Sequence, residues 1–204
     1  MGFYDRYVLP RLLAWAMRQK PLAPYRSRAA GHAAGRVLEL GIGSGCNLPF
    51  YGPDVRSLIG IDPSPALLAI TEHKLGGAPF PVELLQAGGE HLPLDSGSVD
   101  TVLTTWTLCS VADPVQVLRE ARRVLRPDGR LIFVEHGRAP DPNVRVWQDR
   151  ITPAWRRIAG GCHLNRPIDA LLAEAGFAAG ELHTGYMRGP RIATFMYEGQ
   201  ARPG

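Results

Sequence analysis

The stretch VLELGIGSGCNLPFY, from Val37 to Tyr51, joins a strand-like run to three closely spaced glycines. The glycines are Gly41, Gly43 and Gly45. Glycine adopts positive φ without strain and lets another group approach the backbone closely. Glycines placed where a strand turns into a helix are typical of sites for nucleotide-like ligands. The stretch therefore predicts such a site at the carboxyl end of its strand.

Strand-like and helical segments alternate from residue 36 to residue 137, which predicts an α/β fold. This alternation forces right-handed crossovers and a parallel sheet with helices on both faces. After residue 140 the order changes to two helices and then two strands, which we expect to pair as an antiparallel hairpin. The expected strands are 36–40, 57–61, 82–86, 99–104, 130–135, 178–186 and 191–198, and the longer helices are 65–75, 114–125, 143–158 and 166–175.

The bulk composition is that of an ordinary globular protein. The 204 residues, 45% of them hydrophobic and 21% charged, suffice for one domain with its own core. The net charge of +4 is spread along the chain, so it does not argue for nucleic acid. The cysteines, Cys46, Cys109 and Cys162, form no CxxC pair, so we predict neither a metal site nor a disulfide framework. We expect Cys109 to be a buried packing residue, Cys162 to be exposed, and the protein to be cytoplasmic.

The residues around the glycines indicate which nucleotide-like ligand to expect. A dinucleotide site needs GxGxxG, but Cys46 stands where the third glycine should be. Asp62 ends the second expected strand, 21 residues after Gly41, where a carboxylate accepts ribose hydroxyls. Glu39 lies inside the first strand, where it would repel a diphosphate but help to hold a cation. A ligand with a ribose, a positive charge and no phosphate suggests S-adenosylmethionine.

Four segments, in order from residue 36 to residue 137, resemble motifs of the class I S-adenosylmethionine-dependent methyltransferases. ELGIGSGCN resembles motif I, and GIDPSP resembles motif II. AGGEHLPLDSGSVDTVL resembles the adenine loop and fourth strand, and LREARRVLRPDGRLIFVEHG resembles the next helix and strand. The resemblance implies a Rossmann-like, seven-stranded, mostly parallel sheet with an antiparallel last strand. It also implies S-adenosylmethionine as cofactor and S-adenosylhomocysteine as product, and this chemistry requires no metal.

The resemblance also implies a set of cofactor-binding residues. The glycines would pass beneath the methionine portion of the cofactor with Glu39 behind them, and Asp62 would bind the ribose diol. The positions that often carry an acid for adenine are Gly88 and Gly89, so adenine must be held by backbone groups or another side chain. The implied set is Glu39, Gly41, Gly43, Gly45, Asn47, Asp62, Pro63, Gly89, Glu90, Thr105 and Trp106.

A narrower resemblance covers the carboxyl half of the chain. The segments TLCSV, EHG, WQDRITPAW and GGCHLNR occur in the same order as in the methyltransferase-like 7 proteins, which act as alkyl thiol S-methyltransferases. Those proteins begin with a hydrophobic membrane anchor that has no counterpart here, so the resemblance covers the catalytic part. It implies methyl transfer to the sulfur of a small hydrophobic thiol.

A thiol acceptor needs little activation, because roughly a few per cent of a free thiol is already thiolate at neutral pH. Alignment of the acceptor with the methyl group supplies much of the rate. A weak base or a nearby positive charge would therefore suffice to deprotonate the acceptor thiol. The catalytic candidates are His136, His163 and Arg166, each of which also suits a structural hydrogen-bonding role. The candidates for the wall of the acceptor pocket are Tyr4, Tyr7, Trp106, Trp147 and Trp155, although tryptophan is more often a core residue than part of a substrate wall.

We expect a helical flap at 1–35 and a methyltransferase domain at 36–204 with a lid at about 140–166. The flap carries aromatic residues among arginines, so it suits closure over the cofactor or a weak peripheral contact with anionic lipid. We expect closure.

Several alternatives remain open at this level. The alternative within the methyltransferase class is an acceptor that is a phospholipid amine or a quinone-like ring instead of a thiol. Outside it, the chain is a nicotinamide-dependent oxidoreductase or a non-catalytic binding protein. A nucleic-acid methyltransferase is disfavoured, because TTWT stands where an NPPY-type motif would follow the fourth strand. We therefore expect a small-molecule acceptor and no nucleic acid, and leave the oligomeric state open.

Overall fold

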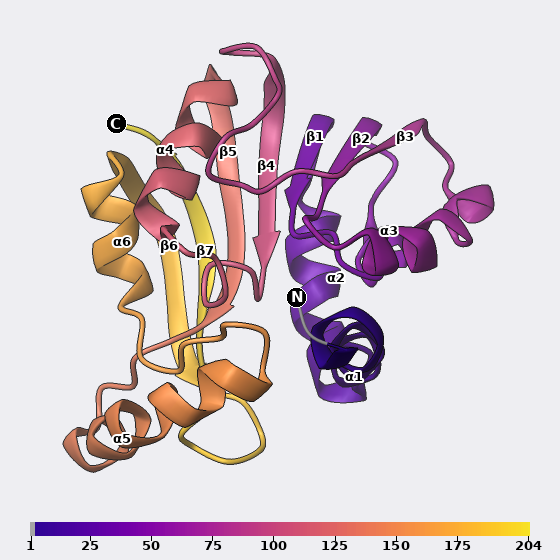
Figure 1. The fold of residues 1–204 in the computed structure, drawn as a ribbon. Helices are drawn as coiled ribbons and strands as arrows, with labels where there is room; N and C mark the ends of the chain where they lie inside the picture. The colour runs from indigo at the N-terminus through magenta and orange to yellow at the C-terminus, as the bar shows by residue number, and fades with distance from the viewer. Residues whose placement is uncertain (1–2) are drawn as a thin grey trace.

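The computed structural model describes residues 3–204, apart from the side chains of residues 5, 6 and 179. Its centre is a seven-stranded sheet in the order β3-β2-β1-β4-β5-β7-β6 (Figure 1). β1 to β5 pair in parallel, whereas β7 is antiparallel to both β5 and β6. The predicted mostly parallel α/β sheet with an antiparallel last strand is confirmed. The strands are β1 (Gly35–Leu40), β2 (Val55–Ile61), β3 (Val82–Leu85), β4 (Val99–Thr105), β5 (Leu125–His136), β6 (Phe177–Tyr186) and β7 (Phe195–Pro203).

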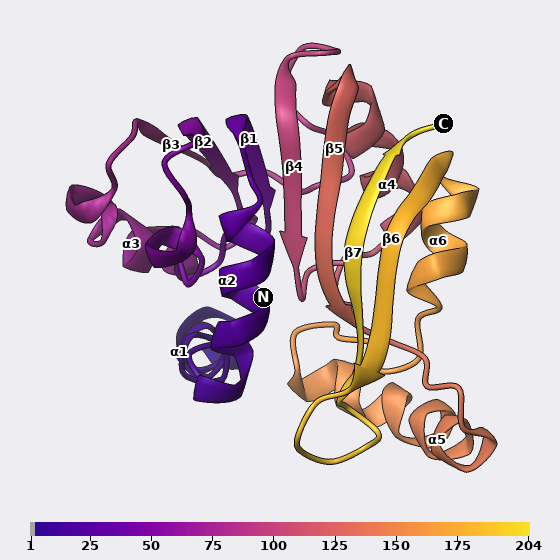
Figure 2. The ribbon, with the colours of Figure 1, turned by 180° about the vertical axis from the view of Figure 1, so that it is seen from behind.

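Helices cover both faces of this sheet, as predicted. α4 and α6 lie on one face in Figure 1, and α2 lies on the opposite face in Figure 2. α5 lies below the sheet, beside the loop that joins β6 to β7. The α-helices are α1 (Leu9–Ala16), α2 (Ala23–Gly31), α3 (Pro65–Glu72), α4 (Pro114–Val124), α5 (Pro142–Ile158) and α6 (Ile168–Glu174). A π-helical turn, η1 (Tyr4–Val8), and three 3-10 helices, η2 (Lys20–Leu22), η3 (Leu48–Phe50) and η4 (Leu75–Gly77), complete the helical segments.

The strands supply two hydrophobic layers by alternation. Leu38 and Leu40 of β1 pack in the layer with α4 and α6, whereas Val37 packs in the layer with α2. Successive side chains of a strand point to opposite faces, so a sheet covered on both sides needs nearly continuous apolar strands. This requirement explains why β1 and β4 are recognisable in the sequence.

Several strand boundaries differ from the prediction, and the starts of β5 and β7 differ by four or five residues. β7 starts at Phe195 and not at residue 191, because residues 187–194 form a closed loop. In that loop the Met187 amide donates to the Thr194 carbonyl at 2.8 Å, and Thr194 Oγ1 donates to Pro190 at 3.0 Å. β5 begins at Leu125, because residues 126–129 bulge out of the pairing with β4 and the strand then continues.

The amino-terminal helices contact the end of α5. Tyr4 donates its hydroxyl to the Ile158 carbonyl at 2.7 Å. Phe3 and Trp15 are 74% and 65% exposed. None of the helices in residues 3–204 has the length and apolar character needed to cross a bilayer. The first two residues of the expected flap lie outside the described residues, and the division into flap, domain and lid stays a prediction.

Candidate active site

The glycine turn after β1 has the backbone conformation that its sequence predicts. Gly41, Gly43 and Gly45 have φ of +69°, +55° and +67°. A Cβ at Gly41 would collide with the Thr107 hydroxyl, and one at Gly45 would lie 2.9 Å from the Leu48 side chain. Glycine is therefore required at Gly41 and Gly45 both by the backbone and by the close approach of neighbours.

Asp62 connects the end of β2 to this turn. Its Oδ2 accepts from the Gly43 amide at 3.0 Å, and its Oδ1 accepts from the Ser64 amide at 2.8 Å. Burial raises the pKa of Asp62, and the two amide hydrogen bonds oppose that rise. Each carboxylate oxygen retains a lone pair beyond these bonds, so the side chain suits a ribose diol. Pro63 follows directly, and the Ser64 hydroxyl accepts from Leu67 to begin α3.

Glu39 is fully enclosed beneath the turn. Its Oε1 accepts from Asn47 Nδ2 at 2.8 Å, and its Oε2 accepts from the Tyr51 hydroxyl at 2.6 Å. Burial raises the pKa of Glu39 to about 7, against the lowering effect of the two hydrogen bonds and of nearby Arg26. Both oxygens of this carboxylate already accept hydrogen bonds from protein side chains, so its effect on a bound cation would be indirect.

Arg26 of α2 extends this network to β4. Its Nη1 donates to Asn47 Oδ1 at 2.7 Å, and its guanidinium carbon lies 4.8 Å from the centre of the Trp106 ring. Asn47 Nδ2 also donates to Thr105 Oγ1 at 3.0 Å. Sequence reasoning missed Arg26 and Tyr51, because their partners lie on other elements and no spacing rule connects them. The network fixes the amino-terminal region against the predicted cofactor site.

Trp106 follows β4 with a strained backbone. Its φ of +52° is the one positive value found among the described residues other than glycine. Its amide donates to the Val134 carbonyl at 2.8 Å, and Tyr25 meets its ring edge-on at 6.4 Å. Such strain in a bulky residue persists only where the surroundings impose it, and it is concentrated at functional sites.

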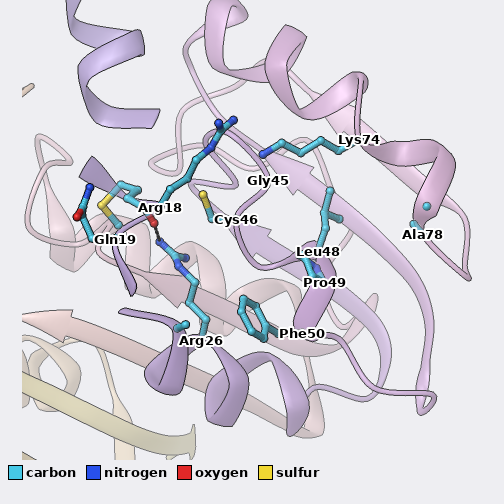
Figure 3. Close-up of a pocket in the computed structure, with 13 residues that line it drawn as sticks. Arg18, Gln19, Arg26, Gly45, Cys46, Leu48, Pro49, Phe50, Lys74 and Ala78 are labelled. Atoms are coloured by element: carbon cyan, nitrogen blue, oxygen red, sulfur yellow. Dashed lines mark hydrogen bonds between the residues drawn. The ribbon is translucent and has the colours of Figure 1, made fainter. Parts of the chain in front are cut away.

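A cavity of about 430 Å³ lies between the glycine turn, α2 and the end of α3 (Figure 3). Three cationic side chains line it, from Arg18, Arg26 and Lys74, and Cys46 lies among them. Lys74 donates to the carbonyl of Ser44 in the turn. The cavity adjoins the turn through Gly45, whereas Asp62 lies outside its lining.

The residues predicted to lie beside adenine contact the segment that leads into α4 and α4 itself. Glu90 Oε1 accepts from the Ala112 amide at 3.2 Å. Gly89 lies against Val117 of α4, where a Cβ would approach to 3.1 Å. The adenine roles of Gly89 and Glu90 stay predictions.

The acceptor side brings together residues that are far apart in the sequence. His136, at the end of β5, has Nε2 at 3.2 Å from Cys162 Sγ. Cys109 is buried, as expected, and its thiol belongs to the same cluster. Cys162 is half-buried, so its predicted exposure was wrong, because its loop folds back onto β5. The contact with Cys109 and burial both raise the pKa of the Cys162 thiol, so it stays protonated.

His163 and Arg166 attach the segment after α5 to the loop after β4. The His163 amide and Nδ1 both face the Cys109 carbonyl, at 2.7 and 3.1 Å. Arg166 donates to the carbonyls of Leu108 and Val111. These contacts are structural, and the catalytic roles of His163 and Arg166 stay predictions.

The five candidates for the acceptor wall lie in different environments. Trp147 is 55% exposed and lies beside Arg150 on α5. Trp155 is half-buried, and its Nε1 is buried with no hydrogen-bond partner among the described groups. Tyr4 contacts the end of α5, and Tyr7 lies 5.1 Å from the Phe3 ring. Trp106 faces Arg26, so the structure does not group it with the tryptophans of α5.

Comparisons with known proteins agree with this geometry. Residues 38–133 match the model of the methyltransferase domain family. Thiol S-methyltransferase TMT1B of Homo sapiens is 40% identical over 152 residues, which cover 72% of this chain and 62% of that protein. Phosphatidylethanolamine N-methyltransferase of Cereibacter sphaeroides is 36% identical over 117 residues, covering 54% of this chain and 57% of that protein. The chain thus spans less than two thirds of these relatives.

Solved structures support the same fold. A possible histamine N-methyltransferase from Thermotoga maritima superposes with a TM-score of 0.69 at 21% identity and covers 98% of both chains. At this identity the likeness concerns the fold and not the acceptor. Residues 38–133 therefore belong to the methyltransferase domain family, in a chain that resembles the thiol S-methyltransferases in sequence and the S-adenosylmethionine-dependent methyltransferases in fold.

Proposed function

We propose that this protein transfers the methyl group of S-adenosylmethionine to the sulfur of a small hydrophobic thiol. The observation that carries the proposal is the 40% identity to a thiol S-methyltransferase, which extends over 72% of the chain. The likeness to an N-methyltransferase covers only 54% of the chain.

The residues of the glycine turn fit the cofactor. Asp62 would hold the ribose, since it already aligns Gly43 and Ser64 and keeps lone pairs available. The turn needs glycine because of its positive φ values, and glycine leaves no side chains where the cofactor would pass. Bound there, S-adenosylmethionine supplies a methyl group activated by a sulfonium.

The rest of the chain would orient the acceptor and exclude water. Arg26 and Trp106 hold α2 against the edge of the sheet where the turn lies. Tyr4 holds η1 against the end of α5. A thiol is a strong nucleophile with a pKa close to neutral pH, so it needs alignment more than a strong base.

The test is methyl transfer from labelled cofactor to matched acceptors. Alkyl and aryl thiols are compared with the corresponding alcohols and amines, with a quinol and with phosphatidylethanolamine. We expect product on thiols only, and its loss in Asp62→Ala, with Asp54→Ala as the exposed control. Turnover on an amine or quinol and none on thiols would contradict the sulfur assignment.

A further inference from the structure

Cys109, His136 and Cys162 bring three metal-binding side chains to one point. Their ligand atoms all lie within 4.8 Å of one another. Two sulfurs on one tetrahedral zinc ion, each bonded at about 2.3 Å, lie roughly 3.8 Å apart. We propose that these three residues bind a zinc ion whose fourth position is open to the acceptor sulfur.

The donor set suits zinc in number and type. Two thiolates and one imidazole leave one tetrahedral position vacant, which is the arrangement of catalytic rather than structural zinc sites. Soft sulfur ligands disfavour magnesium and calcium, which require oxygen. No spacing rule predicts this cluster, because the two cysteines are 53 residues apart and the histidine lies between them.

The cluster is buried and incompletely satisfied by protein groups. Cys109 and His136 are 2% and 8% exposed. His136 Nε2 contacts Cys162, whereas its Nδ1 is buried without a partner among the described residues. The neighbouring carboxylate of Glu135 also has one buried oxygen, Oε2, without a partner there. A cation bound at the cluster would offset the charge of this buried carboxylate.

The cluster lies at the edge of the sheet that carries the predicted cofactor site. Cys109 follows β4, and His136 ends β5 next to it. Thr107, two residues before Cys109, donates Oγ1 to the Leu40 carbonyl at 3.0 Å and contacts Gly41. One short segment therefore joins the glycine turn to the cluster. An acceptor held at the cluster would therefore lie at the same edge of the sheet as the predicted cofactor site.

The role of the metal rests on the proposed function. The methyl transfer at the metal balances without any change of oxidation state. Zinc binding displaces the protons of Cys109 and Cys162 to solvent. An acceptor thiol in the fourth position loses its own proton in the same way and is held as a thiolate. When its sulfur gains the methyl carbon, the electron pair of the broken carbon–sulfur bond stays with the departing sulfur. The thioether that results is a weaker ligand and leaves the zinc, whose charge is unchanged.

The first experiment is a titration of the metal-free full chain with Co²⁺ under a non-thiol reductant. We expect one equivalent to bind, with the strong visible bands of tetrahedral thiolate coordination. Cys109→Ser and Cys162→Ser should each weaken binding at least about 100-fold, because each removes a ligand, and loss of even an outer partner costs 10–100-fold. Cys46→Ser is the matched control, since it removes the remaining cysteine and should keep the spectrum. Circular dichroism checks that each variant is folded.

The second experiment adds a small alkyl thiol, and separately the matching alcohol, to the Co²⁺ form. A change of the visible bands with the thiol only supports the open fourth position. Substoichiometric binding, or a spectrum unaltered by both serine variants, overturns the site. Equal thiol methylation by metal-free and zinc-loaded protein overturns the role of the metal but leaves the proposed function standing. A bound metal with no turnover on any thiol contradicts the proposed function but leaves the metal site standing.

Discussion

Glu39 allows a quantitative test, because its carboxyl is buried among hydrogen-bond donors. Burial raises its pKa from 4.5 to about 7, and Tyr51, Asn47 and Arg26 only partly oppose the rise. The folded protein therefore binds this proton more tightly than the unfolded chain does. The stability that it contributes is fully present below about pH 4.5 and is lost as the pH rises through about 7.

The size of the effect follows from the shift. A change from 4.5 to about 7 corresponds to about 3 kcal/mol of stability lost across that pH range. Glu39→Gln removes the titration and keeps both the shape of the side chain and an acceptor oxygen for Tyr51. We therefore expect the free energy of unfolding of Glu39→Gln, relative to the native sequence, to increase by about 3 kcal/mol between about pH 4 and pH 8.

The assay is urea unfolding of the cofactor-free protein across this pH range. All other titrating groups are common to both proteins, so the difference between them isolates Glu39. Glu83→Gln, at an exposed site on β3, is the control for the same change of side chain. A constant difference for Glu39→Gln would contradict this prediction, because it would mean that folding does not change the pKa of Glu39.

Three further substitutions test other parts of the account. Asp62→Ala should weaken cofactor binding at least about 10-fold in calorimetry, and unchanged affinity would rule out its ribose role. Gly41→Ala should lower the free energy of unfolding, measured in urea, by at least about 2 kcal/mol, because it adds a side chain at positive φ against Thr107. A loss below about 0.5 kcal/mol would show that the turn can rearrange. Arg26→Lys should cost about 1–2 kcal/mol of stability, because lysine cannot stack its charge on Trp106 in the same way, and an unaffected midpoint would remove the network from the account.

Much of the fold follows from local patterns in the sequence. The alternation of strands and helices predicted the parallel sheet, and the absence of a helix after α6 predicted the antiparallel hairpin. The glycine turn and Asp62 could be located because both lie at strand ends, which periodicity identifies. The start of β7 was misplaced because residues 192–194 look like strand, whereas Gly189 and Pro190 close a loop that local composition does not define.

The contacts between distant elements could not be predicted. Arg26 meets Asn47 only because α2 packs across the sheet next to η3. Cys109 and Cys162 meet because the loop after α5 folds onto the end of β5. Such meetings depend on the packing of whole elements, so single-residue patterns carry no signal for them.

The central claim, methyl transfer to sulfur, is tested most directly with one acceptor that offers both nucleophiles. A hydrophobic aminoalkanethiol is incubated with the protein and methyl-labelled cofactor, and the product is identified by mass spectrometry and NMR. We expect label on sulfur alone, and no product with Asp62→Ala. Label on nitrogen would contradict it and assign the protein to the amine methyltransferases.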